Sequence, residues 1–107
     1  MVLKKDYTIV VSNGFGRLVK STSFGKIFFI RVSGPDKGFS IEIYTKGNII
    51  YKYENSEYDT IVDQVELPLM GDIDIRITGP DGNYIVALGI EEEKIENLTK
   101  YLYIIQT

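Results

Sequence analysis

The stretch IRVSGPDKGF, residues 30–39, returns almost unchanged as IRITGPDGNY, residues 75–84. In each copy, apolar residues alternate with polar ones up to a Gly-Pro-Asp turn, and the alternation resumes after it. A period of two is typical of a half-buried β-strand. Proline presets φ at the second position of a β-turn, and aspartate can accept hydrogen bonds from nearby backbone. Each copy is therefore predicted to be a hairpin of strand, turn and strand.

Further short segments around the repeat also have strand character. They are YTIVV (7–11), IIYKY (49–53), TIVDQVEL (60–67, ending at Pro68) and YIVALGI (84–90), with a turn at TKGN (45–48). YIVALGI is apolar at successive positions, which favours a central strand. Many short strands without a long helix predict an all-β, mainly antiparallel sandwich of about seven to eight strands, with an internally duplicated hairpin. The length of 107 residues fits a single domain, 1–107.

The last segment, EEEKIENLTKYLYIIQT (91–107), fits two structures. Its apolar spacing and leading glutamates favour a short helix beginning near Glu91, while YLYIIQT is rich in strand formers and would make an eighth strand.

The register of the second copy, applied to the first, assigns its side chains to two faces. The predicted core face holds Phe28, Ile30, Val32, Phe39, Ile41 and Ile43. The predicted outward face holds Phe29, Arg31, Ser33, Ser40, Glu42 and Tyr44, with Tyr51 or Tyr53 following on the next strand.

The composition excludes several kinds of chemistry. The chain has no cysteine and no histidine, so it lacks a thiolate nucleophile, the usual neutral-pH base and the commonest metal ligand. Asp72 and Asp74 lie on one strand face at a spacing some glycosidases use, but outward carboxylates on a strand serve mainly solubility and edge protection. Asp36 and Asp81 are expected to cap their turns. We expect no catalysis, no cofactor and no metal.

Charge is unevenly divided along the chain. Residues 1–53 hold nine Lys or Arg and three acids, whereas residues 54–107 hold three and twelve. The two halves are expected to interleave in the fold; if they segregate instead, head-to-tail contacts between copies could build a ring or filament.

Three functions fit these patterns. The first is a structural or adaptor module that contacts a protein partner or itself through the outward face of Phe29, Arg31, Glu42, Tyr44 and Tyr51. The second is a carbohydrate-binding sandwich that uses the same aromatic residues. The third, less favoured, is single-stranded nucleic-acid binding through a basic patch of Arg17, Lys20 and Lys26, which an acidic chain would have to cluster on one face.

Location and source are only weakly indicated. The uncharged run in MVLKKDYTIVV (1–11) is too short for a signal-peptide core or a membrane span, so a cytoplasmic chain, or one whose leader has been removed, is expected. Abundant isoleucine with two glutamines and no cysteine is typical of thermophiles, and small β-rich chains of this composition occur in archaea and their viruses.

Overall fold

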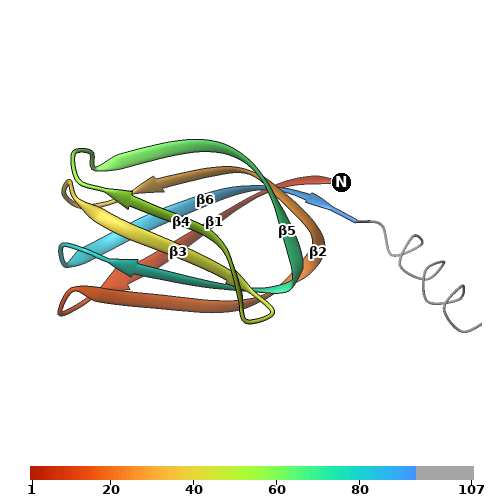
Figure 1. Cartoon of the computed structure of the whole chain (residues 1–107), viewed down its shortest axis with the longest axis horizontal. Helices are drawn as coiled ribbons and strands as arrows, with labels where there is room; N and C mark the ends of the chain where they lie inside the picture. The colour runs from red at the N-terminus through yellow and green to blue at the C-terminus, as the bar shows by residue number, and fades with distance from the viewer. Residues whose placement is uncertain (94–107) are drawn as a thin grey trace, which may run out of the picture.

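The computed structural model describes residues 1–93 as an antiparallel β-structure. Its strands are β1 (Val2–Val11), β2 (Phe15–Ser33), β3 (Phe39–Thr45), β4 (Asn48–Asn55), β5 (Thr60–Thr78) and β6 (Gly82–Glu92). They form one six-stranded sheet in the order β1-β6-β2-β5-β3-β4 (Figure 1). The all-β, antiparallel prediction is confirmed, with six strands among these residues because the segments predicted at 60–67 and 72–78 are one strand.

The strand order is symmetric about its centre. Exchanging β1 with β4, β2 with β5 and β3 with β6 gives the same order read from the opposite edge of the sheet. The central strands β2 and β5 are both 19 residues long and contain the first strands of the two repeats, residues 30–33 and 75–78. The chain therefore forms its fold from two successive three-stranded units placed around the β2–β5 pair.

The repeated turns are not hairpin loops, and the prediction of hairpin pairing is wrong. After residues 34–38 the chain passes over β5 to place β3 on its far side, and after residues 79–81 it passes over β2 to place β6 on its far side. Each repeat thus pairs its second strand with the other repeat's first strand. The pairs Ile41↔Ile77 and Val32↔Val86 show this exchange.

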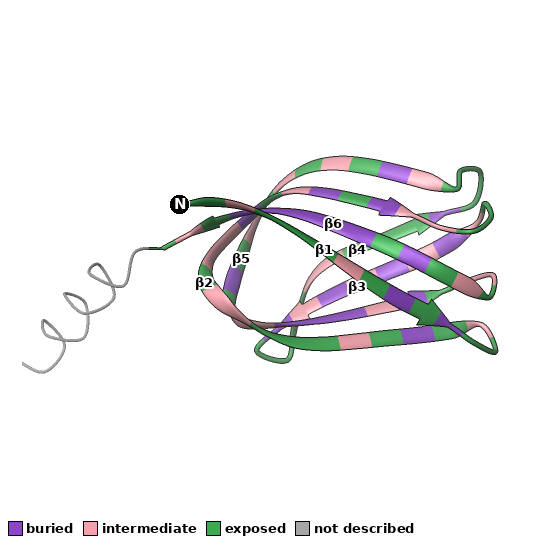
Figure 2. Ribbon diagram, turned by 180° about the vertical axis from the view of Figure 1, so that it is seen from behind, coloured by how far each residue is buried: buried purple, intermediate pink, exposed green. Residues whose placement is uncertain are grey.

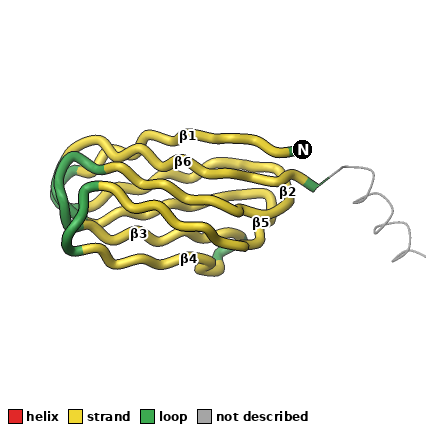
Figure 3. Tube along the Cα trace, turned by 90° about the horizontal axis from the view of Figure 1, so that it is seen from above, coloured by secondary structure: helices red, strands yellow, loops and turns green. Residues whose placement is uncertain are grey.

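The repeated glycines make matching hydrogen bonds at these crossings. The amide of Gly34 donates to the carbonyl of Asp59 (2.7 Å), and the amide of Gly79 donates to the carbonyl of Gly14 (3.0 Å). The Asp81 carboxylate also accepts from the Gly14 amide (2.9 Å), while Asp36 accepts from its neighbour Lys37. These bonds join connections that gather at one end of the strands, as seen from above in Figure 3.

The strand β5 continues through Pro68, so the predicted end of the strand there is wrong. At this position β5 pairs with β2 only, because its pairing with β3 is confined to residues 74–78. A proline is tolerated where one edge of a strand is unpaired. Near the same point β5 and β2 bend, at Gly71 (φ 96°) and at the register shift between Ser21 and Phe24. The bends fold the sheet over its own inner face (Figure 1).

The core lies on this inner face. Figure 2 shows buried positions alternating with exposed ones along the strands. The fully buried residues come from both units and are mostly isoleucine, which suits a pleated buried surface. They include Ile27, Ile30, Val32, Ile41, Ile43, Ile73, Ile75, Ile77, Val86 and Leu88.

The core prediction fails at Phe28, which is 36% exposed. A β-bulge between Ile27 and Phe29 inserts one extra residue opposite β6, where Ile27 pairs with Ile90 and Phe29 with Gly89. A bulge re-aims the side chain that it contains. The Phe28 ring consequently lies against Gly89, where a Cβ would come within 2.8 Å of it.

The described end of the chain is a strand. Glu91 and Glu92 belong to β6, so a helix beginning at Glu91 is wrong; the rest of the predicted helix or eighth strand, 94–107, lies outside the described residues. The β6 strand pairs with both β1 and β2, which confirms its central placement. None of the elements in residues 1–93 is a helix of the length and apolarity needed for crossing a membrane.

Candidate functional site

The outer side of β3 and of residues 72–78, here called the polar face, carries charged side chains that pair with one another. The Asp74 carboxylate accepts two hydrogen bonds from Arg17 (3.0 and 2.7 Å) and one from Nη2 of Arg76 (3.1 Å). Hydrogen bonding by Arg17 holds the pKa of Asp74 below its ordinary value. The Arg76 guanidinium lies 4.3 Å from the centre of the Tyr44 ring, a cation–π contact. Partners within the chain therefore occupy these groups.

The second carboxylate of the sequence pair is also occupied, in a turn. The Asp72 carboxylate accepts from the Lys46 amide (2.8 Å) and from the Thr45 hydroxyl (3.3 Å), while Asp74 faces the two arginines. Asp72 thus fixes the turn between β3 and β4. Among residues 1–93 no three side chains of the metal-ligating types come together.

The predicted basic patch is not a patch. Arg17 pairs with Asp74 on the polar face (2.7 Å), and Lys26 pairs with Glu66 (3.5 Å) and Glu91 (3.8 Å). Lys20 lines a separate cleft beside β1. Each of these ion pairs joins a cation from the basic half of the sequence to an acid from the acidic half, so the halves interleave as expected.

The predicted outward face is divided between two surfaces. Phe29 and Arg31 lie on β2 beside β6, where they pair with Gly89 and Ala87. Glu42 and Tyr44 lie on β3, beyond β5. The sequence grouped them as one face on the assumption that β2 and β3 pair, and the inserted β5 separates them. A flat aromatic platform built from Phe29 and Tyr44 is not formed.

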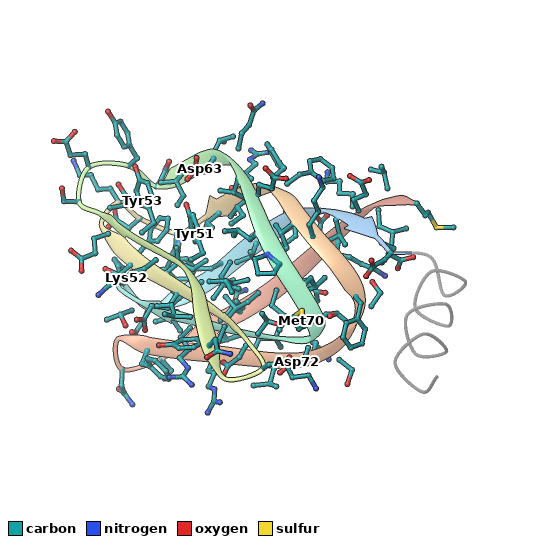
Figure 4. All side chains as sticks on the ribbon, turned by 45° about the vertical axis from the view of Figure 1, so that its right-hand side comes forward. Tyr51, Lys52, Tyr53, Asp63, Met70 and Asp72 are labelled. Carbon is teal, nitrogen blue, oxygen red and sulfur yellow. The ribbon has the colours of Figure 1, made fainter. Side chains whose placement is uncertain are left out.

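Tyr51 turns inward rather than outward. It pairs in register with the buried Ile43 and packs against the core. Its hydroxyl donates to the Asp63 carboxylate (3.0 Å), bridging β4 and β5; Figure 4 shows the two labelled residues on these strands. Burial, with this hydrogen bond as a second cause, raises the pKa of Tyr51. The bulge between Ile43 and Tyr44, absent from the pattern, puts Tyr51 on this side.

The structure forms a different surface on the outer side of β1, β6 and β2. A shallow hollow of about 160 Å³, here called the Arg31 hollow, is lined by Lys4, Asp6, Arg31, Ser33, Ile85 and Ala87. Ala87 forms its floor between Asp6 of β1 and Arg31 of β2, which are its register partners. Val62, the partner of Arg31 on β5, is 61% exposed, and Ile85 is 50% exposed.

Sequence reasoning placed Arg31 and Ser33 on an outward face and missed Lys4, Asp6, Ile85 and Ala87. The available signal is the apolar outward series Ile85, Ala87 and Gly89 in YIVALGI, which is also typical of a central strand. Lys4 and Asp6 join the surface only because β1 pairs with β6, and the sequence offers no sign of that partner.

Comparisons with known proteins support the fold. No protein-family model matches the chain, and no curated protein matches it in sequence. Among solved structures, the Drosophila NLP core, described for pentamer formation and histone binding, is similar with a TM-score of 0.53 and 12% identity, over 87% of this chain and 100% of that chain. The carbohydrate-binding module CBM36, solved with calcium and xylotriose, has a TM-score of 0.39 and 12% sequence identity. The match covers 78% of this chain and 76% of that chain.

Proposed function

We propose that this chain is a non-catalytic assembly module, and that a second copy of the chain is bound at the Arg31 hollow. The observation that carries the proposal is a contrast between equivalent positions. Arg76 and Arg31 occupy the same place in the two repeats, yet Arg76 has Asp74 and Tyr44 as partners. In residues 1–93, the Arg31 side chain makes no ion pair within 4.0 Å.

The neighbours of the two arginines differ in a consistent way. Each neighbour of Arg76 has an equivalent beside Arg31. Phe29 stands in place of Asp74, Gly89 in place of Tyr44, and Ala87 in place of Glu42. One face thus fills its surface with its own charged and aromatic groups. The other exposes a guanidinium beside small and apolar residues, which suits the apolar centre and scattered charges of a protein interface.

Charge complementarity favours a second copy as the occupant. Within residues 1–93, Lys4 and Asp6 of the hollow also form no ion pair. Two copies facing one another about a twofold axis would each place Asp6 against the other's Arg31, because an isologous contact repeats every pair twice. The NLP core, whose fold is similar, forms a pentamer, which is consistent with a role in assembly.

The test is molar mass by light scattering on the full chain, at roughly 0.05 M and 1 M salt, since the screening length falls from above 10 Å to about 3 Å over that range. Ile85→Lys is expected to shift the chain to monomer. The control Val19→Lys, at a comparably exposed valine of β2 opposite Asp74 and outside the Arg31 hollow, is expected to leave the mass unchanged. A wild-type monomer at all concentrations would contradict the proposal.

A charge exchange tests the twofold contact. Arg31→Glu and Asp6→Arg should each weaken association alone, because each places like charges against one another in both halves of the contact. Mixing the two variants should restore association, because the carboxylate introduced at position 31 of one copy then faces the guanidinium introduced at position 6 of the other. If the mixture stays monomeric while the wild type associates, another surface mediates assembly.

The other two functions need surfaces that residues 1–93 do not provide at the predicted positions. Carbohydrate binding was expected on an aromatic platform that the fold divides, and nucleic-acid binding on basic residues of which Arg17 and Lys26 are paired with acids.

A further inference from the structure

A cleft of about 400 Å³ opens between β1 and the first part of β2. The two strands are joined at the turn of residues 12–15 and then separate, because β1 pairs with β6 while β2 pairs with β5. The walls of the cleft are Lys5 and Tyr7 from β1 and the run Lys20–Ser23 from β2. The lining thus combines two lysines and several hydroxyl-bearing residues with the apolar residues Leu3 and Ile90.

The two lysines occupy inward positions of their strands. Lys5 is the register partner of Leu88, and Lys20 is the register partner of Ile73; both partners are fully buried. Residues directly opposite one another in an antiparallel pair project to the same side of the sheet. Both ammonium groups thus come from positions that face the core side, where the strand pattern calls for apolar residues.

The equivalent place in the second unit, between β4 and β5, has apolar residues where the first unit has Lys20. There, β4 and β5 are joined by the Tyr51–Asp63 hydrogen bond (3.0 Å). Val65 stands at the position equivalent to Lys20, and Leu67 at that equivalent to Thr22, and both pack against the core. The second unit therefore forms its part of the sheet with apolar side chains at these positions, so a lysine at position 20 is not needed to form the sheet.

We propose that the cleft between β1 and β2 binds a small multivalent anion of the phosphate class, either free or as the phosphate group of a larger compound. Lys5 and Lys20 each offer three ammonium donors, and the hydroxyl of Tyr7, at the inward position opposite the buried Val86, adds a neutral donor. Neither lysine forms an ion pair within the described part of the chain. One carboxylate, that of Glu92, also lines the cleft, which leaves the lining with a net positive charge.

The experiment is calorimetric titration of the full chain at low salt with inorganic phosphate, pyrophosphate and glycerol phosphate, paired with melting curves. One saturable site is expected, with a higher melting temperature in the anion, because a ligand that binds only the folded state stabilises it. Tighter binding of glycerol phosphate than of inorganic phosphate would identify an attached phosphate as the ligand, and the reverse order a free one.

A lysine outside both proposed sites supplies the control. Lys37 is exposed in the connection between β2 and β3 and lines neither the cleft nor the Arg31 hollow. Lys5→Gln and Lys20→Gln should each weaken binding about tenfold, which corresponds to 1.4 kcal/mol, and Lys37→Gln should leave it unchanged.

Two results would overturn the proposal. Equal weakening by Lys37→Gln would mean that anions respond only to overall charge. The second result is that none of the three anions gives a heat of binding or changes the melting temperature. The lysines would then serve edge protection, in which inward-pointing charges prevent a strand from pairing with another chain. The site is separate from the assembly surface, so either result leaves the proposed function untouched.

Discussion

Phe39 and Tyr84, which hold the same position in the two repeats, meet edge to face beside the two repeated turns, with ring centroids 5.4 Å apart and planes at 78°. This geometry is favourable for aromatic pairs. The Tyr84 hydroxyl donates to the carbonyl of Pro80 (2.7 Å), which ties the ring to the turn of its own repeat. The repeat is thus retained in both copies at a place where the copies contact one another.

The first prediction concerns the glycines under these rings. A Cβ on Gly34 would lie 2.6 Å from the Tyr84 ring, and one on Gly79 would lie 2.8 Å from Cβ of Phe39. Because overpacking a filled site is destabilising, Gly34→Ala and Gly79→Ala should each lower the free energy of unfolding by about 1–3 kcal/mol in denaturant titrations.

A double-mutant cycle provides the control. Gly34→Ala should lower the free energy of unfolding by less in a Tyr84→Leu background than in the wild type. The reason is that the leucine side chain at position 84 can move away from the new methyl group. Equal losses in both backgrounds would show that the ring is not the cause.

The second prediction concerns the bridge between β4 and β5. Tyr51→Phe removes the hydroxyl that donates to Asp63 while keeping the packed ring. It should lower the free energy of unfolding by about 1.5–3 kcal/mol, the usual net value of a hydrogen bond to a charged group, measured by denaturant titration. Tyr53→Phe is the matched control, because the Tyr53 ring stacks beside Tyr51 but the residue is 39% exposed. This change should lower the free energy of unfolding by no more than about 0.5 kcal/mol. Equal effects of the two changes would contradict the bridge.

The third prediction concerns pH. The pKa of Asp74 is lowered in the folded state, chiefly by hydrogen bonds from Arg17, so its ionised form stabilises the fold above the ordinary aspartate pKa. This contribution is present at neutral pH and is lost as the pH falls from about 4 through the lowered pKa. Asp74→Asn should therefore destabilise the protein at neutral pH, by about 2 kcal/mol, and progressively less in acid.

Melting curves of both proteins between about pH 2 and about pH 7, a range that spans the titration of aspartate, check this prediction. A gap between wild type and Asp74→Asn that is the same at every pH would show that the loss arises from packing rather than from charge. Asp72→Asn, which alters a turn cap, serves as a second carboxylate for comparison.

Much of the fold was predictable because strand formation is read from local alternation. The segments around Ile30, Ile41 and Ile75 show a strict period of two, and their buried sides were predicted correctly. Phe28 and Tyr51 failed for a shared reason. Each lies at or just after a bulge, and one inserted residue reverses the facing of a side chain without leaving a mark in the alternation.

The candidate sites were far less predictable, because they depend on which strands become neighbours. Arg31 was named from the sequence, but its companions Lys4 and Asp6 arrive from β1 through β6. Lys20 was grouped with Arg17 by proximity in the chain. In the fold Arg17 meets Asp74, and Lys20 lines the cleft with Lys5.

The sequence by itself determined that this chain is built of antiparallel strands and that two units of it are alike, because alternation, turn residues and the Gly-Pro-Asp repeat are local properties of the chain. Only the tertiary structure decided that the two repeats exchange their second strands, and so which charges are paired and which remain available. The physical reason is that strand pairing is made by backbone hydrogen bonds, which every residue except proline can form, so partner choice depends on burying the isoleucine faces of both units together rather than on any one segment.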